Sequence, residues 1–344
     1  MTEEPSQESN PVSAADPNVS AILLSHNCSE VIAAALHSVL GQDCEPMEVI
    51  VSDDASGDAT YTILQREIAT YKGPHKITLR RRDTNSGSKS AHLNDIFPLA
   101  SGQFLVSFDG DDIAEPHRVR KILAAFLESE RVSAVYSDYS YMDEAGRATG
   151  RRGVLHPPIG TDPRHWFARV DAYASGATLA VRRDVVETFG PLDPKINEDV
   201  VLPFRASLLG DVRFIDQDLV RVRRWEGSLT AAHERFISID RYRAWLLRGI
   251  AQARRQLESR IEDLRKAEQL KLIQPEELEE LEQIAVASMA EAEASAGLAS
   301  PSLLVRMRCF ARLAWSGSHP EDLPQNAFVT LAPRLYLSYK RRKL

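Results

Sequence analysis

The sequence predicts an α/β protein in which helices flank a mainly parallel sheet and a mostly helical C-terminal region follows. Two patterns indicate this fold. Between residues 19 and 139, apolar runs of strand length alternate with segments of helical periodicity, which is typical of consecutive βαβ units. After about residue 233, charged segments carry apolar residues three or four positions apart, such as Leu257, Ile261 and Leu264, as amphipathic helices do.

The elements of the first region can be placed from local signals. Apolar runs mark the strands, Ser29 is expected to cap the first helix, and Pro116 suits the first turn of another. We expect strands at 19–25, 47–52, 76–81, 103–108 and 133–139, and helices at 31–40, 58–71, 88–99 and 116–127.

The second half of the chain is less regular. Residues 142–175 are rich in Gly, Pro and Arg, and we expect them to form loops around a cleft. Pro275 is expected to begin a tail helix. We also expect strands at 177–181 and 212–215, and helices at 200–209 and 303–313.

These patterns divide the chain into three parts. We expect a disordered leader over residues 1–18, because that segment is polar and acidic. An α/β domain is expected over 19–232 and a helical region over 233–344. The heptad-like spacing of the tail is too short to predict a coiled coil, so three arrangements stay open. In these arrangements, the tail helices would pack on the α/β domain, pair in a homodimer, or contact another partner.

The composition excludes several classes of protein. The 344 residues include 42 basic and 49 acidic side chains, whereas a nucleic-acid-binding domain is usually basic. No apolar run approaches the ~18–20 residues of a membrane span, and the first residues contain no signal peptide. The three cysteines fit neither a disulfide framework nor a metal motif. We therefore expect a cytoplasmic protein, and its basic end at 340–343 allows only a peripheral contact with the inner face of the membrane.

The strongest chemical signal is Asp109-Gly110-Asp111-Asp112, directly after the expected strand at 103–108. Residues i and i+2 of an extended segment point to the same side, so Asp109 and Asp111 can face one ligand. Close carboxylates repel each other unless a cation lies between them. Mg²⁺ or Mn²⁺, held by one or two carboxylates and by substrate phosphates, would fit there and neutralise a leaving diphosphate. An acidic surface turn is the alternative.

A second acidic segment follows the expected strand at 47–52. The carboxylates of Asp53 and Asp54 can accept hydrogen bonds from the imide of uracil or from a ribose hydroxyl. Helix capping by Ser56 or Asp58 is the alternative, and both interpretations can hold at once.

A third acidic segment, Asn197-Glu198-Asp199, precedes the expected helix at 200–209. The helix dipole favours the ionised form of Asp199, which can then remove a proton from an acceptor hydroxyl. A plain helix N-cap is the alternative.

In this order, the motifs resemble those of the family-two glycosyltransferases, which are inverting enzymes of the GT-A fold, a Rossmann-like α/β fold. The resemblance covers about residues 19–230. The matching segments are Ser25-His26-Asn27, Asp53–Thr60, Asn85-Ser86-Gly87 with Ala91 and Asn94, Phe108–Asp112, and Glu198-Asp199.

The resemblance implies donor-binding roles for the first acidic residues. Asp54, beside Asp53, would contact the nucleotide base, most often uracil. Asp109 would contact the donor ribose, and Asp111 would hold the Mg²⁺ or Mn²⁺ ion that bridges the diphosphate. Secondary donor contacts are expected from Ser25, Asn27 and Lys89.

The resemblance also implies the catalytic residue. Asp199 would be the base, and the acceptor oxygen would attack the anomeric carbon in a single in-line displacement. Its neighbour Glu198 would lie against the acceptor. Relatives often carry a histidine at the position of Trp225, so Arg223 or Arg224 would take over part of the diphosphate binding here. The indole of Trp225 would stack on the acceptor sugar or be a buried structural side chain.

The expected activity is the transfer of a sugar from a nucleotide sugar, most often a UDP-sugar, to a glycan or lipid-linked glycan acceptor during surface polysaccharide synthesis. Two other classes remain open. A metal-dependent phosphohydrolase would use Asp109 as nucleophile and Asp111 as acid, but such enzymes place this motif after their first strand. A non-catalytic nucleotide-binding or scaffold protein would have a degenerate site, and the intact acidic motifs speak against it.

Overall fold

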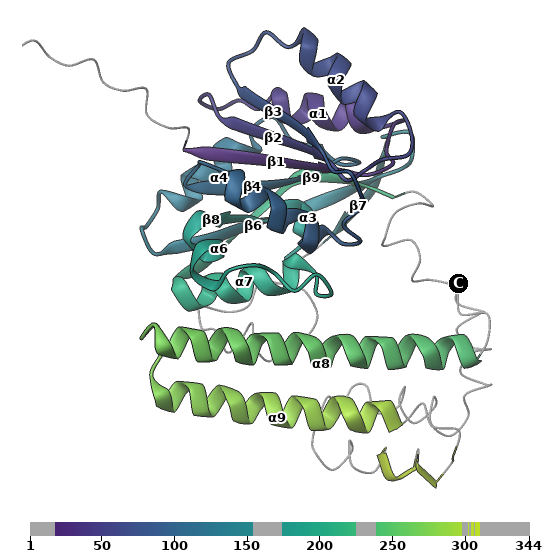
Figure 1. The fold of residues 1–344 in the computed structure, drawn as a ribbon, viewed down its shortest axis with the longest axis vertical. Helices are drawn as coiled ribbons and strands as arrows, with labels where there is room; N and C mark the ends of the chain where they lie inside the picture. The colour runs from purple at the N-terminus through teal and green to yellow at the C-terminus, as the bar shows by residue number, and fades with distance from the viewer. Residues whose placement is uncertain are drawn as a thin grey trace, which may run out of the picture.

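The computed structural model describes residues 18–153, 174–224 and 239–297, together with single positions between 302 and 309. Helices cover both faces of one curled sheet, and two long helices, α8 and α9, lie side by side with α8 next to α7 (Figure 1). The strands are β1 (Val19–Ser25), β2 (Glu48–Asp53), β3 (Lys76–Arg81), β4 (Phe104–Asp109), β5 (Ile113–Ala114), β6 (Val132–Met142), β7 (Ala148–Gly153), β8 (Ala180–Arg182) and β9 (Asp211–Arg223). The helices are α1 (Ile32–Leu40), α2 (Thr60–Thr70), α3 (Lys89–Ile96), α4 (Arg118–Phe126), α6 (Arg183–Phe189), α7 (Glu198–Leu209), α8 (Ile239–Gln269) and α9 (Pro275–Gly297), with 3₁₀ turns η1 (Phe97–Leu99) and η2 (Gly176–Thr178).

The sheet is mainly parallel, as the sequence predicts. Its strand order is β3-β2-β1-β4-β8-β6-β9-β5, and β7 pairs with β6. Strand β1 is parallel to both β2 and β4, and β6 is parallel to β9. Because β1, β2 and β4 run side by side in the same direction, their carboxyl ends meet at one edge of the sheet (Figure 1).

Alternate residues of β1 enter two separate cores. Ala21 and Leu23 pack on the side of α1 and α4, whereas Ile22 and Leu24 pack on the side of α3 and α7. All four side chains are buried. A strand covered on both faces is a continuous apolar run rather than an alternating one, which explains why the sequence locates it so well.

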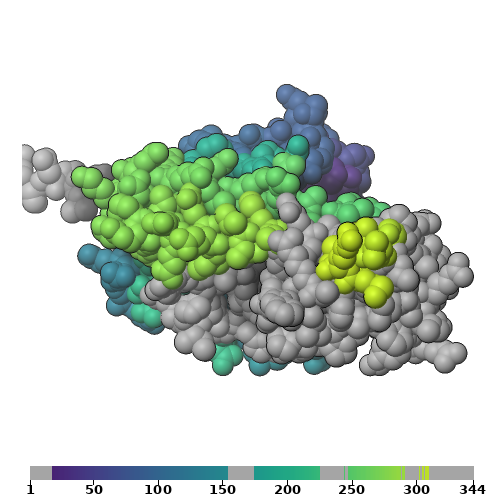
Figure 2. Space-filling model, turned by 90° about the horizontal axis from the view of Figure 1, so that it is seen from below, coloured from purple at the N-terminus to yellow at the C-terminus, as the bar shows by residue number. Residues whose placement is uncertain are grey.

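The tail helices pack on the α/β part of the chain. Leu264 of α8 and Leu281 of α9 are fully buried in the core that also contains α7. In Figure 2, α8 and α9 lie over much of the face seen from below. The docking also contains a buried ion pair, in which Nε of Arg205 on α7 lies 2.9 Å from Oδ2 of Asp263 on α8. Of the three arrangements expected for the tail, this one is therefore present.

The expected elements are found with boundaries shifted by a few residues, and three expectations were wrong. Ser29 does not cap a helix: α1 begins at Ile32, and the backbone N–H of Ser29 instead donates to Asp58. The stretch 142–175 is not all loop, because residues 148–153 form β7. The expected strand at 212–215 extends to residue 223 as β9, which pairs with β6 along that length.

Several expectations fall on residues outside the described ranges. These are the leader at 1–18, except its last residue, and most of the expected helix at 303–313, of which the described positions are helical. Within the described residues, no helix combines the length and apolar character that crossing a membrane requires.

The buried pair between α7 and α8 leads to a stability prediction. Asp263→Ala leaves the guanidinium of Arg205, whose side chain is 6% exposed, without its carboxylate. We expect the free energy of unfolding in urea to fall by about 3–5 kcal/mol, because an uncompensated buried charge is costly. The matched control is Glu258→Ala on α8, which removes the exposed Arg254–Glu258 pair and should cost less than about 0.5 kcal/mol. Equal losses in the two variants would contradict the docking.

Candidate active site

The carboxyl ends of three parallel strands bring the predicted acidic motifs together. In the sheet register, Ser25 at the end of β1 lies beside Asp53 at the end of β2, and Leu24 lies beside Asp109 at the end of β4. Gly110 makes this approach possible, since a Cβ there would lie 2.8 Å from the carbonyl oxygen of Leu24. The acidic segments after β2 and β4, which begin at Asp53 and Asp109, are thus parts of one site.

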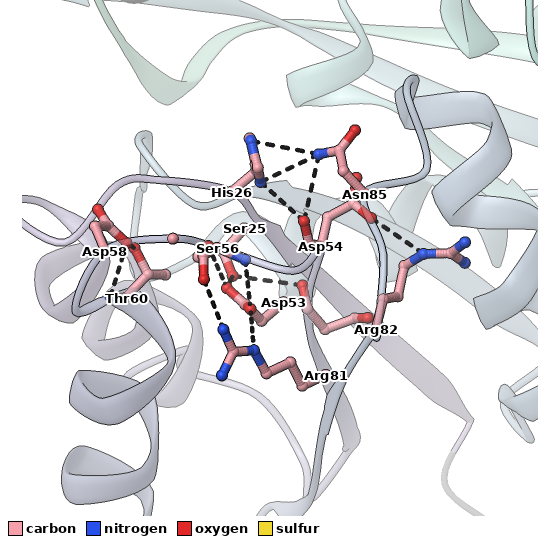
Figure 3. A network of polar contacts seen from close by, with 12 residues as sticks. Ser25, His26, Asp53, Asp54, Ser56, Asp58, Thr60, Arg81, Arg82 and Asn85 are labelled. Carbon is pink, nitrogen blue, oxygen red and sulfur yellow. Dashed lines mark hydrogen bonds and ion pairs between the residues drawn. The ribbon is translucent and has the colours of Figure 1, made fainter.

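Asp53 is fully buried and shapes its own turn (Figure 3). Its Oδ2 accepts from the backbone N–H of Ser56 at 3.0 Å, and its Oδ1 accepts from the hydroxyl of Ser56 at 2.5 Å. Nε of Arg81 lies 3.3 Å from the same carboxylate, and the hydroxyl of Ser25 also points to it, at 3.4 Å. Asp53 therefore holds the loop after β2, and the protein itself satisfies its charge.

Asp54 fastens a second loop to the same edge. Its Oδ1 accepts from the backbone N–H of Ser86 at 2.8 Å, and its Oδ2 accepts from the hydroxyl of Ser86 at 2.6 Å. Nε of Arg82 lies 3.1 Å from Oδ1. The resemblance makes Asp54 the base-binding residue, and the structure shows that this carboxylate also positions the loop around Ser86.

The loop after β1 is tied to both neighbours. Asn27 has a left-handed backbone (φ 48°), and its side-chain oxygen accepts from the backbone N–H of Gly57 at 2.8 Å. The ring of His26 lies 2.9 Å from the carbonyl oxygen of Asp54 and within 3.3 Å of the Asn85 amide (Figure 3). Three segments that are distant in sequence thus form one rim.

Asp58 lies one residue before the N-cap of α2, which is Ala59 and has no side-chain capping hydrogen bond, so Asp58 holds the turn before the helix. Burial opposes its ionisation, but hydrogen bonds from Thr60 and Ser29 prevail and hold the pKa of Asp58 at about 2. Its Oδ1 accepts from the backbone N–H of Thr60, the first residue of α2, at 3.0 Å. Within this motif, Asp58 therefore fixes the turn before α2, whereas Asp53 and Asp54 lie at the edge of the sheet.

Lys89, at the start of α3, connects two acidic motifs. Its Nζ lies 2.6 Å from Oδ1 of Asp109 and 3.0 Å from Oε1 of Glu198. Burial opposes the charge, but these two carboxylates prevail and raise the pKa of Lys89 above its usual value. The lysine is therefore not a solvated surface residue, because its ammonium joins the donor-side carboxylate to the first turn of α7.

Asp199 lies next to this bridge, in the first turn of α7. Burial, followed by the charge of Glu198, raises the pKa of Asp199 to about 7, although Lys89 and a hydrogen bond from the Gly176 backbone oppose the shift. Its Oδ1 is buried and has no hydrogen-bond partner among the described residues. The expectation that the helix dipole keeps Asp199 readily ionised was wrong, because desolvation outweighs the dipole here.

Asp112 and Arg223 close the far side of the site. The backbone N–H of Arg223 donates to Oδ1 of Asp112 at 2.9 Å, and burial together with Asp111 and Asp109 raises the pKa of Asp112. The guanidinium of Arg223 donates to the carbonyl oxygens of Asp111 at 2.9 Å and Glu144 at 2.7 Å. These contacts support the Asp111 turn, and direct binding of the diphosphate by Arg223 stays a prediction.

Arg224 lies against the ring of Tyr141, with its guanidinium carbon 4.3 Å from the ring centroid. Its donor-binding role stays a prediction. Trp225, the expected acceptor contact, lies outside the described residues.

The carboxylates suit a divalent cation that is bound together with a substrate. Within the described parts of the chain, no three His, Cys, Asp or Glu side chains gather as a metal site. A cation that a diphosphate helps to hold needs only one or two carboxylates. Asp109 and Asp111 meet that requirement, because both are partly accessible and their combined charge already raises the pKa of the neighbouring Asp112.

Sequence reasoning missed two residues of the site. Gly176 in η2 packs so closely that a Cβ would meet Oε1 of Glu198 and lie 3.2 Å from Nζ of Lys89. Arg118 is fully buried under the ring of Phe108, and burial lowers its pKa to about 10. No local signal reveals either one, since Gly176 lies in an irregular stretch and Arg118 follows the pattern of a solvated helix face.

One family model matches the part of the chain that carries the first acidic motifs. The model of the family described as Glycosyl transferase family 2 matches residues 20–190. The putative glycosyltransferase EpsE of Bacillus subtilis (strain 168) is 36% identical over 115 residues, which are 33% of this chain and 40% of that protein. The chain therefore matches less than half the length of this relative.

Two solved structures share the fold. S. aureus TarS 1–349 in complex with UDP-GlcNAc has a TM-score of 0.53 at 19% identity, over 92% of both chains. The mannosyltransferase PcManGT from Pyrobaculum calidifontis, in complex with GDP-Man and Mn²⁺, has a TM-score of 0.52 at 18% identity, over 95% of this chain and 84% of that one. At these identities the likeness shows the GT-A-type fold alone.

The environment of Asp199 predicts an unusual titration. We expect carbon-13 NMR of the carboxyl groups to show one aspartate with a pKa of about 7. Glu198→Gln removes a neighbouring negative charge and should lower this pKa, whereas Lys89→Met removes a positive charge and should raise it. The resonance is assigned by its loss in Asp199→Asn. A pKa near that of an exposed aspartate, unmoved by both variants, would contradict the geometry.

Proposed function

We propose that this chain, which belongs to glycosyl transferase family 2 through residues 20–190, is a sugar-transferring enzyme. It transfers a sugar from a nucleotide sugar to an acceptor hydroxyl. One observation carries the proposal. A buried carboxylate with a pKa of about 7 and an unpartnered oxygen, Asp199, is linked through Glu198 and Lys89 to Asp109 at the carboxyl edge of the sheet. Ligands of open α/β sheets bind at this edge.

Asp199 is the catalytic base in this proposal. A base with a pKa near the working pH combines a useful ionised fraction with a strong affinity for the proton. The unpartnered Oδ1 is the atom that takes the proton from the acceptor hydroxyl while the acceptor oxygen attacks the anomeric carbon. The main role of Glu198 is to hold Lys89 through their ion pair, and its contact with the acceptor is a secondary role.

The rim formed by the loops after β1 and β2 binds the nucleotide. Asp54 lies beside His26 and Asn85, whose polar groups face the same edge (Figure 3). Ser25 and Asn27 support this rim from β1, and Asp53 holds its turn. We expect a uridine nucleotide there, because family members with this motif most often use uracil.

The diphosphate lies over the end of β4. A divalent cation held by Asp111, beside Asp109, would neutralise the charge of the leaving diphosphate. Arg223 supports the Asp111 turn from the other side and adds positive charge to the same region. We propose Mg²⁺ or Mn²⁺, since both prefer oxygen ligands.

The acceptor is proposed to be a glycan or a lipid-linked glycan, with Trp225 as a sugar contact. The proposed division of the chain remains a catalytic domain over 19–232 and a helical region over 233–344. A cytoplasmic location, with a peripheral contact at the inner face of the membrane, remains a prediction.

The donor class is tested by calorimetric titration of the full chain with UDP, GDP and ADP, with and without Mn²⁺. We expect UDP to bind most tightly and to lose at least about tenfold in affinity without the metal, because a cation held by Asp111 would offset the charge of the diphosphate. Asp111→Asn should remove the effect of the metal. Tighter binding of GDP would change the donor, and no binding of any nucleotide would contradict the proposal.

The base is tested by Asp199→Asn. This substitution keeps the size of the side chain, so nucleotide binding should persist while sugar transfer falls by at least about a hundredfold. In the unaltered chain, kcat/KM should rise with pH and level off above about 7, since only the ionised carboxylate accepts the proton. Full transfer activity in the asparagine variant would remove Asp199 from the mechanism.

A further inference from the structure

A cluster of aromatic and cationic side chains follows β6, β7 and β9, and only one of its members, Arg224, has a predicted role so far. It comprises Tyr139 and Tyr141 of β6, Arg151 of β7 and Arg224 directly after β9, and we call it the Tyr–Arg platform. Tyr139 and Tyr141 are two positions apart on one strand, so both point to the same face of the sheet.

The two tyrosines are held in a fixed arrangement. Their rings are 5.3 Å apart and nearly perpendicular, and their hydroxyl oxygens are 3.2 Å apart. The ring of Tyr139 lies directly over Gly153 of β7, where a Cβ would come within 2.1 Å of a ring carbon. Aromatic faces fixed in this way suit the apolar face of a sugar, and the hydroxyls suit its polar edge.

Positive charge approaches Tyr141 from both neighbouring strands. The guanidinium carbon of Arg224 lies 4.3 Å from the ring centroid, and that of Arg151 lies 5.9 Å from it. Arg224 also donates to the Tyr141 hydroxyl at 3.1 Å. Two cations therefore lie near one neutral ring, and an anion bound beside them would offset their mutual repulsion.

The carboxylates of these strands are engaged elsewhere. Asp138 and Asp218 pair with Arg152, and Asp143 pairs with Arg147. Among the described residues, no carboxylate pairs with Arg151 or Arg224, and the buried Nε of Arg224 has no hydrogen-bond partner. A planar guanidinium without a carboxylate partner is suited to a phosphate or a carboxylate, which such a group can bind with two parallel hydrogen bonds.

The platform is continuous with the proposed active site. Arg223, the residue before Arg224, bonds to both Asp111 and Asp112. The turn η2, whose Gly176 backbone donates to Asp199, packs against β6 and β9. Arg224 therefore directly follows the residue that supports the Asp111 turn, and the strands that carry the platform also contact the turn beside Asp199.

We propose that the Tyr–Arg platform binds the acceptor and selects one that carries a phosphate or carboxylate group next to its sugar. This inference rests on the proposed sugar transfer, and it reassigns Arg224 from the donor to the acceptor. The tyrosines contact the sugar ring, and the two arginines bind the anionic group.

The test uses the full chain and three sugar probes, which are glucose 1-phosphate, glucuronate and the neutral methyl glucoside. Binding is measured by calorimetry in the presence of UDP and Mn²⁺. We expect both anionic probes to bind and the neutral one to bind at least about tenfold more weakly, since charge-assisted hydrogen bonds supply the difference. The tighter of the two anionic probes identifies the group that the natural acceptor carries.

Three variants locate the binding. Arg151→Gln and Arg224→Gln should each weaken binding of the anionic probes about tenfold and leave that of the neutral probe unchanged. The matched control is Arg147→Gln on the same hairpin, which removes an exposed arginine that is paired with Asp143 and should change nothing.

Three results would overturn the inference. They are equal binding of the neutral and anionic probes, an equal loss in the Arg147→Gln control, and a weaker affinity for UDP itself in Arg224→Gln. The last result would return Arg224 to the donor site. Absence of UDP binding in the unaltered chain would instead count against the proposed function. The two failures can be told apart, because the probes can also be titrated without nucleotide.

Discussion

The arrangement of this site depends on one electrostatic constraint, which is that parallel strands end in carboxylates at a single edge of the sheet. Negative charges so close together are stable only when hydrogen bonds or cations compensate them. Asp53 and Asp54 receive backbone N–H groups, hydroxyls and arginines, and in doing so they shape two loops. Lys89 compensates Asp109 and Glu198 together, and thereby joins the β4 edge to the first turn of α7.

What the protein leaves uncompensated indicates where substrates act. Among the described residues, Asp199 retains a buried oxygen that has no hydrogen-bond partner. On the opposite side, Arg151 and Arg224 bring positive charge without a carboxylate among the described residues. A proton-accepting group, a place for a cation and a place for an anion thus adjoin one another, as sugar transfer from a nucleoside diphosphate requires.

The sequence predicts the strands and the acidic motifs well for a physical reason. A strand covered on both faces is a continuous apolar run, so β1, which is buried along its whole length, has the expected limits 19–25. The ionisation of Asp199 and the ion pairs of Lys89 could not be predicted, because both depend on burial by segments distant in sequence. The same holds for Gly176, whose close packing appears only when η2 meets α7. The Tyr–Arg platform also needs the pairing of β6 with β7 and β9, which no local pattern indicates.

The most direct test of this account is a crystal structure of the chain grown with a uridine diphosphate sugar and Mn²⁺. The account predicts the nucleotide at the carboxyl ends of β1, β2 and β4, with the metal on Asp111 and the anomeric carbon facing Asp199. A nucleotide bound at another surface, or one bound here with Asp199 turned away from the sugar, would contradict it.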